Sequence, residues 1–271
     1  MSELLNYNEL PHWFKDNQYI QTGYRKITHN TYKCIQSIFT LHNETFNIWS
    51  HLVGCIEFAL LLINSFFENL NFENQIILAF YCFTVMICLL NSSIYHTFMC
   101  HSHKINLSCL TIDYLGIIFM IFGSVTLLLH GCFHDAMYKV FSIIYCLLFF
   151  IVLSCIASNI YNPSFYTNDN RSIKVFFLYI ILSLILIPLF HTGLLVSFTS
   201  YHYIIMFSTF VSTCSQYITG MIMYTYRYPE SLFKKNYFDY FGSSHNLWHI
   251  FVIFGANIHF IGMRHLLYFL E

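Results

Sequence analysis

The stretch Ser244-His245-Asn246-Leu247-Trp248-His249 continues directly into the apolar run Ile250-Phe251-Val252-Ile253-Phe254. Two histidines four residues apart lie about one turn apart on the same face of a helix. Here they stand at the start of a hydrophobic helix. Imidazoles at membrane depth are costly unless a partner compensates them, and a metal ion is one such partner. This stretch therefore predicts a membrane helix that carries a pair of metal ligands.

The composition of the whole chain is typical of a membrane protein. Of its 271 residues, 57% are hydrophobic and only 9% are charged, whereas soluble domains have about 25% charged residues. A membrane-spanning helix needs about 20 mostly apolar residues. We therefore predict an all-α fold, with an N-terminal segment at 1–46 and a seven-transmembrane helix bundle at 47–271. The predicted helices are 47–67, 75–95, 109–130, 138–158, 173–196, 201–223 and 247–268.

The N-terminal segment is polar and aromatic. Its residues 12–40 mix apolar and basic side chains, which is compatible with a helix lying on the membrane surface and equally with an irregular tail. We expect no cleaved signal peptide, because no charged n-region followed by an apolar h-region is present in roughly the first 45 residues. The ten cysteines include no C-x-x-C pair, and we interpret them as small buried hydrophobic residues.

The positions of the basic residues predict the orientation, because cytoplasmic loops carry an excess of lysine and arginine. With a cytosolic N-terminus, only Lys139 and Arg264 face the outside or the lumen. The remaining ten face the cytosol: Lys15, Arg25, Lys26, Lys33, Lys104, Arg171, Lys174, Arg227, Lys234 and Lys235. We therefore predict a cytosolic N-terminus and an extracellular or lumenal C-terminus, in the plasma membrane or an endomembrane. The glycosylation sequons at Asn43, Asn106 and Asn170 would then face the cytosol and remain unmodified.

This orientation brings several polar residues to one depth near the cytoplasmic surface. The second predicted helix ends near Ser92 and His96, the third begins near Asp113, and the seventh begins at His245. Three neutral imidazoles with an open fourth position form a catalytic type of zinc site. We therefore predict that His96, His245 and His249 bind Zn²⁺.

Two further residues are candidates for the chemistry. Asp113 could orient a bound water, act as a general base or support a ligand imidazole. Ser92 precedes His96 by four residues and shares its helix face. His101 and His103 are alternative ligands to His96, but they follow the predicted end of the helix.

Other polar residues near the same surface are interpreted as structural. Glu44 and His51 lie at the inner end of the first predicted helix, where they could cap it or support the bundle. Arg227 and Glu230 are expected to form an ion pair that holds the loop before the last helix. The net charge of −1 and the lack of a basic block argue against a nucleic-acid partner. No lysine follows Lys235, so the last helix cannot form a retinal Schiff base.

Several motifs together resemble the progestin and adipoQ receptor family. In chain order they are Gly23-Tyr24-Arg25, His42-Asn43-Glu44-Thr45-Phe46-Asn47-Ile48-Trp49-Ser50-His51, Ser92-Ser93-Ile94-Tyr95-His96-Thr97-Phe98-Met99-Cys100-His101-Ser102, Asp113-Tyr114-Leu115-Gly116-Ile117, Arg227-Tyr228-Pro229-Glu230 and His245-Asn246-Leu247-Trp248-His249. The similarity extends over about residues 23–262, in the order and spacing of the family.

The resemblance implies seven membrane helices with a cytosolic N-terminus. It also implies zinc bound by three histidines that correspond to His96, His245 and His249, with an aspartate and a serine that match Asp113 and Ser92. The activity implied is that of a ceramidase-like hydrolase coupled to lipid signalling or to lipid and metal homeostasis, with membrane lipids such as ceramide or a sterol as partners. The alternative is a receptor or homeostasis sensor in which the zinc is purely structural.

Overall fold

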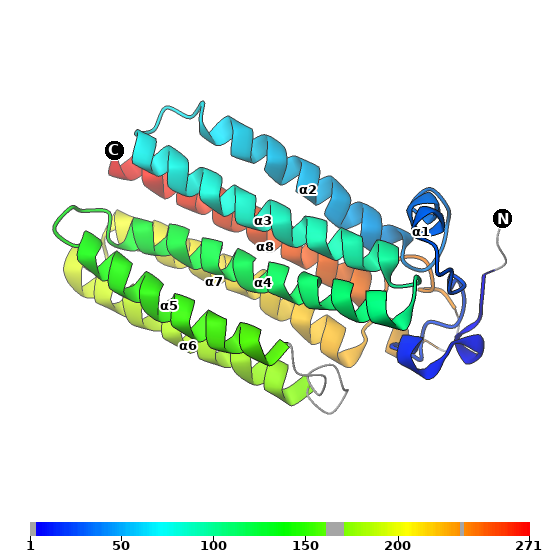
Figure 1. Cartoon of the computed structure of the whole chain (residues 1–271). Helices are drawn as coiled ribbons and strands as arrows, with labels where there is room; N and C mark the ends of the chain where they lie inside the picture. The colour runs from blue at the N-terminus through cyan, green and yellow to red at the C-terminus, as the bar shows by residue number, and fades with distance from the viewer. Residues whose placement is uncertain (1–3, 161–170, 234–235) are drawn as a thin grey trace. The chain divides into compact units, whose positions relative to one another are not determined.

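The computed structural model describes residues 4–160, 171–233 and 236–271 (Figure 1). Within these residues the chain is all-α, as predicted, and contains no β-strand; Leu5 and Tyr24 form an isolated β-bridge. The sequon at Asn170 and the basic residues Lys234 and Lys235 lie outside the described residues.

Seven long helices follow a short one. In order they are α1 (Thr31–Ser37), α2 (Thr45–Ser65), α3 (Phe72–Phe98), α4 (His103–Cys132), α5 (Lys139–Ile160), α6 (Arg171–Val196), α7 (Tyr201–Tyr226) and α8 (Ser244–Leu270). In the described parts of the chain, the 3₁₀ turns η1 (Tyr7–Glu9) and η2 (His12–Phe14) precede α1, and η5 (Glu230–Leu232) lies between α7 and α8. Each predicted span overlaps one of the seven long helices.

Counted over the described residues alone, five of these helices are long and apolar enough to cross a membrane, namely α2, α3, α4, α5 and α8. Their outward side chains agree with a lipid environment. On α5, for example, Ile143, Leu147 and Ile151 are 58–61% exposed. Exposed apolar residues at this density are unusual in soluble proteins. In α6, Ser183–Val196 forms a shorter apolar stretch among the described residues.

The chain divides into two compact units. The first contains Met1–Glu57, Met86–Gly116 and Thr213–Ala256, and the second contains Phe58–Val85, Ile117–Ser212 and Asn257–Glu271. All the predicted site residues belong to the first unit.

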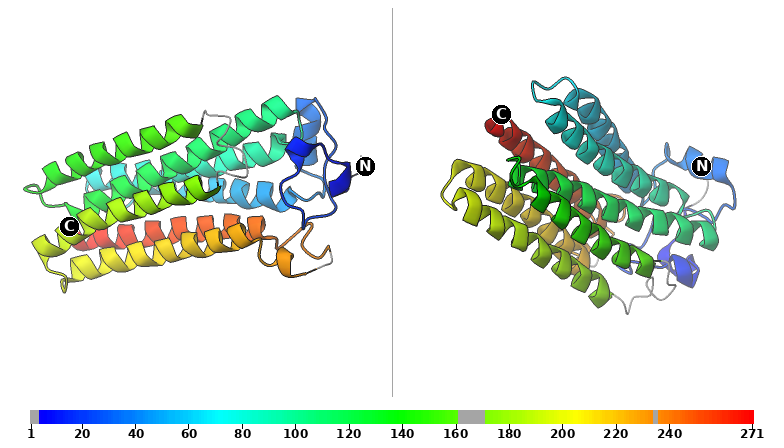
Figure 2. Two further views of the ribbon diagram at one scale, coloured as in Figure 1. Left: turned by 90° about the horizontal axis from the view of Figure 1, so that it is seen from below. Right: turned by 60° about the vertical axis from the view of Figure 1, so that its left-hand side comes forward.

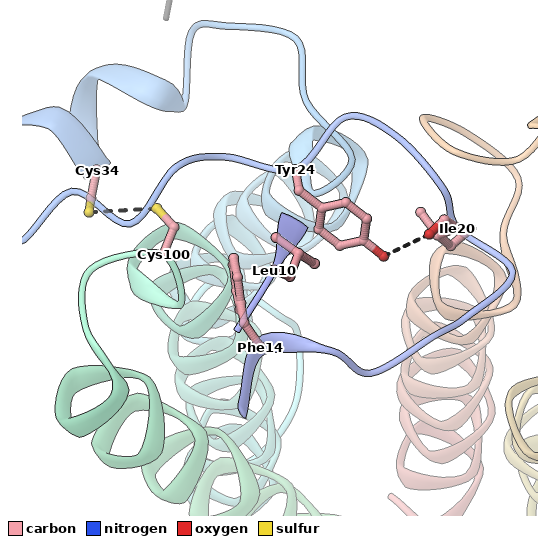
Figure 3. Close-up of a cluster of buried hydrophobic side chains, with 6 residues drawn as sticks. All are labelled: Leu10, Phe14, Ile20, Tyr24, Cys34 and Cys100. Atoms are coloured by element: carbon pink, nitrogen blue, oxygen red, sulfur yellow. Dashed lines mark hydrogen bonds between the residues drawn. The ribbon is translucent and has the colours of Figure 1, made fainter. Parts of the chain in front are cut away.

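In the first unit the N-terminal segment is packed against the protein instead of forming an irregular tail. It lies near the end of α3 and the start of α4 (Figure 2). Its core is a cluster of six buried side chains, shown in Figure 3: Leu10, Phe14, Ile20, Tyr24, Cys34 and Cys100. The Tyr24 hydroxyl donates a 3.0 Å hydrogen bond to the carbonyl of Ile20.

Carboxylates connect this segment to the loop before α8. Asp239 accepts hydrogen bonds from the backbone of Gln21 and Thr22 at 3.1 and 2.9 Å. Arg227 forms a 3.0 Å ion pair with Asp16, so the predicted pairing of Arg227 with Glu230 is wrong. Instead of pairing with Arg227, the carboxylate of Glu230 accepts hydrogen bonds from Ser244 at the N-terminus of α8.

In the second unit helices approach closely at glycines. A Cβ atom added to Gly123 would lie 2.0 Å from Oγ1 of Thr84, and one added to Gly262 would lie 2.1 Å from Oγ1 of Thr209. Small residues at such crossings are typical of membrane helices, where close backbone packing replaces the hydrophobic driving force.

Candidate metal centre

The three histidines predicted as metal ligands come together in the structure. His96 lies near the end of α3, and His245 and His249 lie in the first two turns of α8. One ring nitrogen of each lies within 4.8 Å of the other two. His96 and His249 are only 3% and 2% exposed, whereas His245 is half-buried.

The spacing of the nitrogens suits a tetrahedral metal ion. Nε2 of His96 and Nε2 of His245 are 3.2 Å apart. Two nitrogens bound to one tetrahedral zinc at 2.0–2.1 Å lie about 3.4 Å from each other. Three imidazoles are also a donor set that zinc takes in catalytic sites. The residues present therefore fit a zinc ion.

Glu44 supports His96 from the other side of its ring. Its Oε2 lies 2.8 Å from Nδ1 of His96, which assigns the proton to Nδ1 and leaves Nε2 with a free lone pair. Burial works to raise the pKa of Glu44, but the contact with His96 outweighs it and keeps this pKa below its usual range. A carboxylate behind a ligand histidine fixes the tautomer and makes the ring a better ligand.

A chain of amides extends from Glu44 to α8. The side-chain amide of Asn47 donates a 2.7 Å hydrogen bond to Oε2 of Glu44. Asn246, between the two α8 histidines, donates a 2.7 Å hydrogen bond to Oδ1 of Asn47. These bonds set the positions of α2 and the first turn of α8 relative to each other.

His249 is held by two residues of α2. The hydroxyl of Ser50 lies 3.3 Å from Nδ1 of His249. The ring of His51 stacks on the ring of His249, with centroids 3.6 Å apart and an interplanar angle of 18°. Both ring nitrogens of His51 are buried without a hydrogen-bond partner in the described part of the chain.

The start of α8 is defined by Glu230. This buried carboxylate accepts a 2.7 Å hydrogen bond from the backbone N–H of Ser244 and another bond from the Ser244 hydroxyl. It also accepts one from the side-chain amide of Asn17 at 2.9 Å. A carboxylate at a helix N-terminus is favourable because it pairs with N–H groups that have no partner within the helix.

Asp113 does not belong to the group of mutually close ligand atoms. Asp113, on α4, interacts electrostatically with His96. Ser92 is buried one turn before His96 on α3. Their predicted catalytic roles remain predictions.

The other histidines considered from the sequence have different neighbours. The ring of His101 packs near His29, and that of His103 packs against Trp13 at 5.1 Å between centroids. In the second unit, Nε2 of His259 lies 3.1 Å from the carbonyl oxygen of Ser124. None of these three belongs to the candidate metal cluster.

Sequence reasoning missed the part that Glu44 plays at the metal cluster. The signal was present, because Glu44 directly precedes α2 and was assigned to the cytoplasmic end of that helix. Asp113 is a candidate because it is expected at the same membrane depth as the histidines, and the same reasoning applies to Glu44. Only the helix packing decides which of the two carboxylates reaches a ligand imidazole.

Comparison with known proteins identifies the family of the chain. The sequence profile of the family described as haemolysin-III related matches residues 39–260. The chain is 29% identical over 268 residues to the adiponectin receptor protein of Drosophila melanogaster, covering 96% of this chain and 59% of that protein. It is 32% identical to heptahelical transmembrane protein 1 of Arabidopsis thaliana, with 95% and 79% covered. It is also 32% identical to ADIPOR-like receptor IZH2 of Saccharomyces cerevisiae, with 97% and 84% covered.

The matched region includes every ligand of the candidate metal centre and Glu44 behind it. The apolar helices and the family together make the protein an integral, multi-pass membrane protein. The chain therefore belongs to the haemolysin-III-related family, in which its relatives include adiponectin-receptor-like and progestin and adipoQ receptor-like proteins.

Proposed function

We propose that this protein is a zinc-dependent hydrolase that cleaves the amide bond of a ceramide-like membrane lipid, coupled to signalling or to lipid and metal homeostasis. The observation that carries the proposal is the cluster of His96, His245 and His249, whose ligand nitrogens lie within 4.8 Å of one another. Three histidines leave one position of a tetrahedral ion open for water, which is the arrangement of catalytic zinc sites.

In this proposal Glu44, Asp113 and Ser92 have different roles. Zinc, when bound, lowers the pKa of its water to about 7 and polarises a carbonyl oxygen. Glu44 keeps Nε2 of His96 directed at the ion through the 2.8 Å contact with Nδ1. Asp113 takes a proton from the attacking water and delivers it to the leaving amine, and the hydroxyl of Ser92 helps to orient that water. The products are a fatty acid and a sphingoid base.

The proposed topology has seven spans, formed by α2 to α8, with the N-terminus in the cytosol. The excess of basic residues at the N-terminal side of the membrane supports this orientation. The name of the Arabidopsis relative, a heptahelical transmembrane protein, supports the number of spans. The metal cluster then lies near the cytoplasmic surface of the plasma membrane or of an endomembrane, and a lipid reaches it sideways from the bilayer.

A second candidate function is a receptor or homeostasis sensor with a structural zinc. Two observations favour it. The Drosophila and yeast relatives are named as receptors, and the carboxylate of Asp113 lies outside the group of mutually close ligand atoms. In this case the ion stabilises the packing of α3 on α8 and performs no chemistry.

Metal analysis of the purified protein tests both functions. We expect about one zinc per chain in the wild type, and loss of that zinc in His96→Ala and His249→Ala. The matched control is His259→Ala, which removes a buried histidine of the same helix outside the cluster and should retain the metal. A wild type without zinc, or zinc retained in both ligand variants, would refute both functions.

Asp113→Asn then separates the hydrolase from the sensor. A hydrolase should keep its zinc and lose about 10²- to 10⁴-fold in ceramide turnover, the usual contribution of a general acid or base. Zinc binding with no ceramide turnover in the wild type would leave the structural-zinc receptor as the function.

A further inference from the structure

Two cysteines from distant parts of the chain face each other in the first unit. Cys34 lies on α1, and Cys100 lies between the end of α3 and the start of α4. Their sulfur atoms are 3.8 Å apart, and both residues are completely buried (Figure 3). All ten cysteines are free thiols, and among the described residues no other two form a sulfur–sulfur contact of this kind.

The pair belongs to the buried apolar cluster of Figure 3, but it also makes polar contacts. The hydroxyl of Thr28 lies 3.3 Å from the sulfur of Cys34. The backbone N–H of Thr28 donates a 3.1 Å hydrogen bond to the carbonyl of Cys100. Ser37 donates a 2.7 Å hydrogen bond to the carbonyl of Cys34 and accepts one of 2.7 Å from Arg25.

These contacts favour the thiolate form of one sulfur. The hydrogen bond with Cys100, then that with Thr28 and the positive charge of Arg25, lower the pKa of Cys34 in spite of its burial. The same hydrogen bond and burial raise the pKa of Cys100. The thiolate is the reactive form of cysteine, so the pair combines a nucleophile with a neighbouring thiol that can resolve its oxidised form.

We propose that Cys34 and Cys100 are an oxidative modification site, at which a peroxide converts the two thiols into a disulfide and a dithiol reductant restores them. The thiolate of Cys34 attacks a peroxide oxygen, which breaks the O–O bond, releases water after protonation and leaves a sulfenic acid. The sulfur of Cys100 then attacks the sulfenic sulfur and releases a second water. Both sulfurs are oxidised, and the peroxide accepts the two electrons.

The bond would cross-link two segments next to the metal cluster. It would join positions 66 residues apart in the chain, and Cys100 follows the ligand His96 by four residues. Arg25 already connects these segments, because it donates hydrogen bonds to the carbonyls of His96 and Thr97 at 2.5 and 3.0 Å. Oxidation would add a covalent connection to this contact.

The reversibility of the site rests on the cytosolic orientation proposed above, because disulfides in the cytosol are usually transient and redox-sensing. The disulfide itself does not depend on the metal or on any hydrolase activity. Its detection can therefore fail or succeed independently of the zinc measurement.

Peptide mapping of the full-length protein in detergent tests the proposal. After treatment with hydrogen peroxide, the wild type should yield one cross-linked peptide that joins Cys34 to Cys100, with two hydrogens lost. Dithiothreitol should restore the two thiols. Cys34→Ser and Cys100→Ser should not form the cross-link, whereas Cys109→Ser, which removes a neighbouring buried thiol on α4, should form it normally.

Two results would overturn the proposal. In the first, both thiols remain free although the exposed Cys155 in the same sample is oxidised, which shows that the oxidant was effective. In the second, the wild type is isolated with the disulfide already formed and millimolar reduced glutathione does not open it. Both results are measured on the wild type, so they remain decisive even if the serine variants fold poorly.

Discussion

At the scale of single residues, the most informative side chain is Glu44. An imidazole presents a defined nitrogen to a metal only when its other nitrogen is engaged, and Glu44 engages Nδ1 of His96 at 2.8 Å. The same carboxylate accepts a hydrogen bond from Asn47. Glu44 therefore orients a candidate ligand and does not itself belong to the cluster.

Neutralising this carboxylate should weaken metal binding without unfolding the protein. In Glu44→Gln, we expect the affinity for zinc to fall about 10- to 100-fold, the usual effect of losing a charged partner behind a ligand histidine. Competition with a chromogenic chelator measures the change. Glu57→Gln, which alters a carboxylate within α2, should bind zinc as the wild type does. Equal affinities in the two variants would show that Glu44 has no part in metal binding.

At the scale of elements, the N-terminus of α8 determines where two of the three ligands lie. His245 is the second residue of this helix, so any change in the start of α8 moves it directly. Glu230 defines that start by accepting hydrogen bonds from Ser244 and Asn17. These bonds explain why Glu230 is buried without pairing with Arg227.

Removing the Glu230 side chain should destabilise the protein. In Glu230→Ala, buried donors of Ser244 and Asn17 lose their acceptor, at a cost of about 2–4 kcal/mol in the free energy of unfolding. Thermal melting should show a Tm lower by about 5–10 °C, and Glu230→Gln should have a smaller effect. Glu9→Ala, which removes an exposed carboxylate hydrogen-bonded to Asn6, serves as the control. If both alanine variants melt at the same temperature, Glu230 does not anchor α8.

At the scale of the whole molecule, the positions of the lysine and arginine residues along the chain indicate the membrane topology. Only 9% of the residues are charged, and most basic residues precede α2 or lie between the long helices. Lysine and arginine in short loops resist translocation across a membrane. This is the physical basis for the cytosolic N-terminus that we propose.

Glycosylation tags at the two termini test this topology in any membrane of the secretory pathway. A linker with an acceptor sequon should be glycosylated when appended after Glu271 and should remain unmodified when placed before Met1. The reverse result would contradict the orientation. Modification of both tags, or of neither, would contradict an odd number of spans.

The sequence alone determined the class of the protein and the positions of its long helices. Runs of about 20 apolar residues are long enough to span a bilayer, so the positions of the seven long helices follow from composition. The H-x-x-x-H spacing places His245 and His249 on one face of α8 because the helical repeat is local. These features depend on residues close in the chain, and they could be predicted without knowing how the helices pack.

Contacts between distant residues were decided only by the tertiary structure. From the sequence, His96, His101 and His103 were all candidates for the third ligand, and in the folded structure it is His96 that lies beside His245 and His249. Glu44 and Asp113 were both expected at the depth of the histidines, and in the folded structure it is Glu44 that contacts the imidazole of His96. The sequence presented Cys34 and Cys100 as ordinary core residues, and packing made them a pair. The reason is geometric: depth in a membrane follows from position along one helix, but distance across the protein depends on how each helix is rotated against its neighbours.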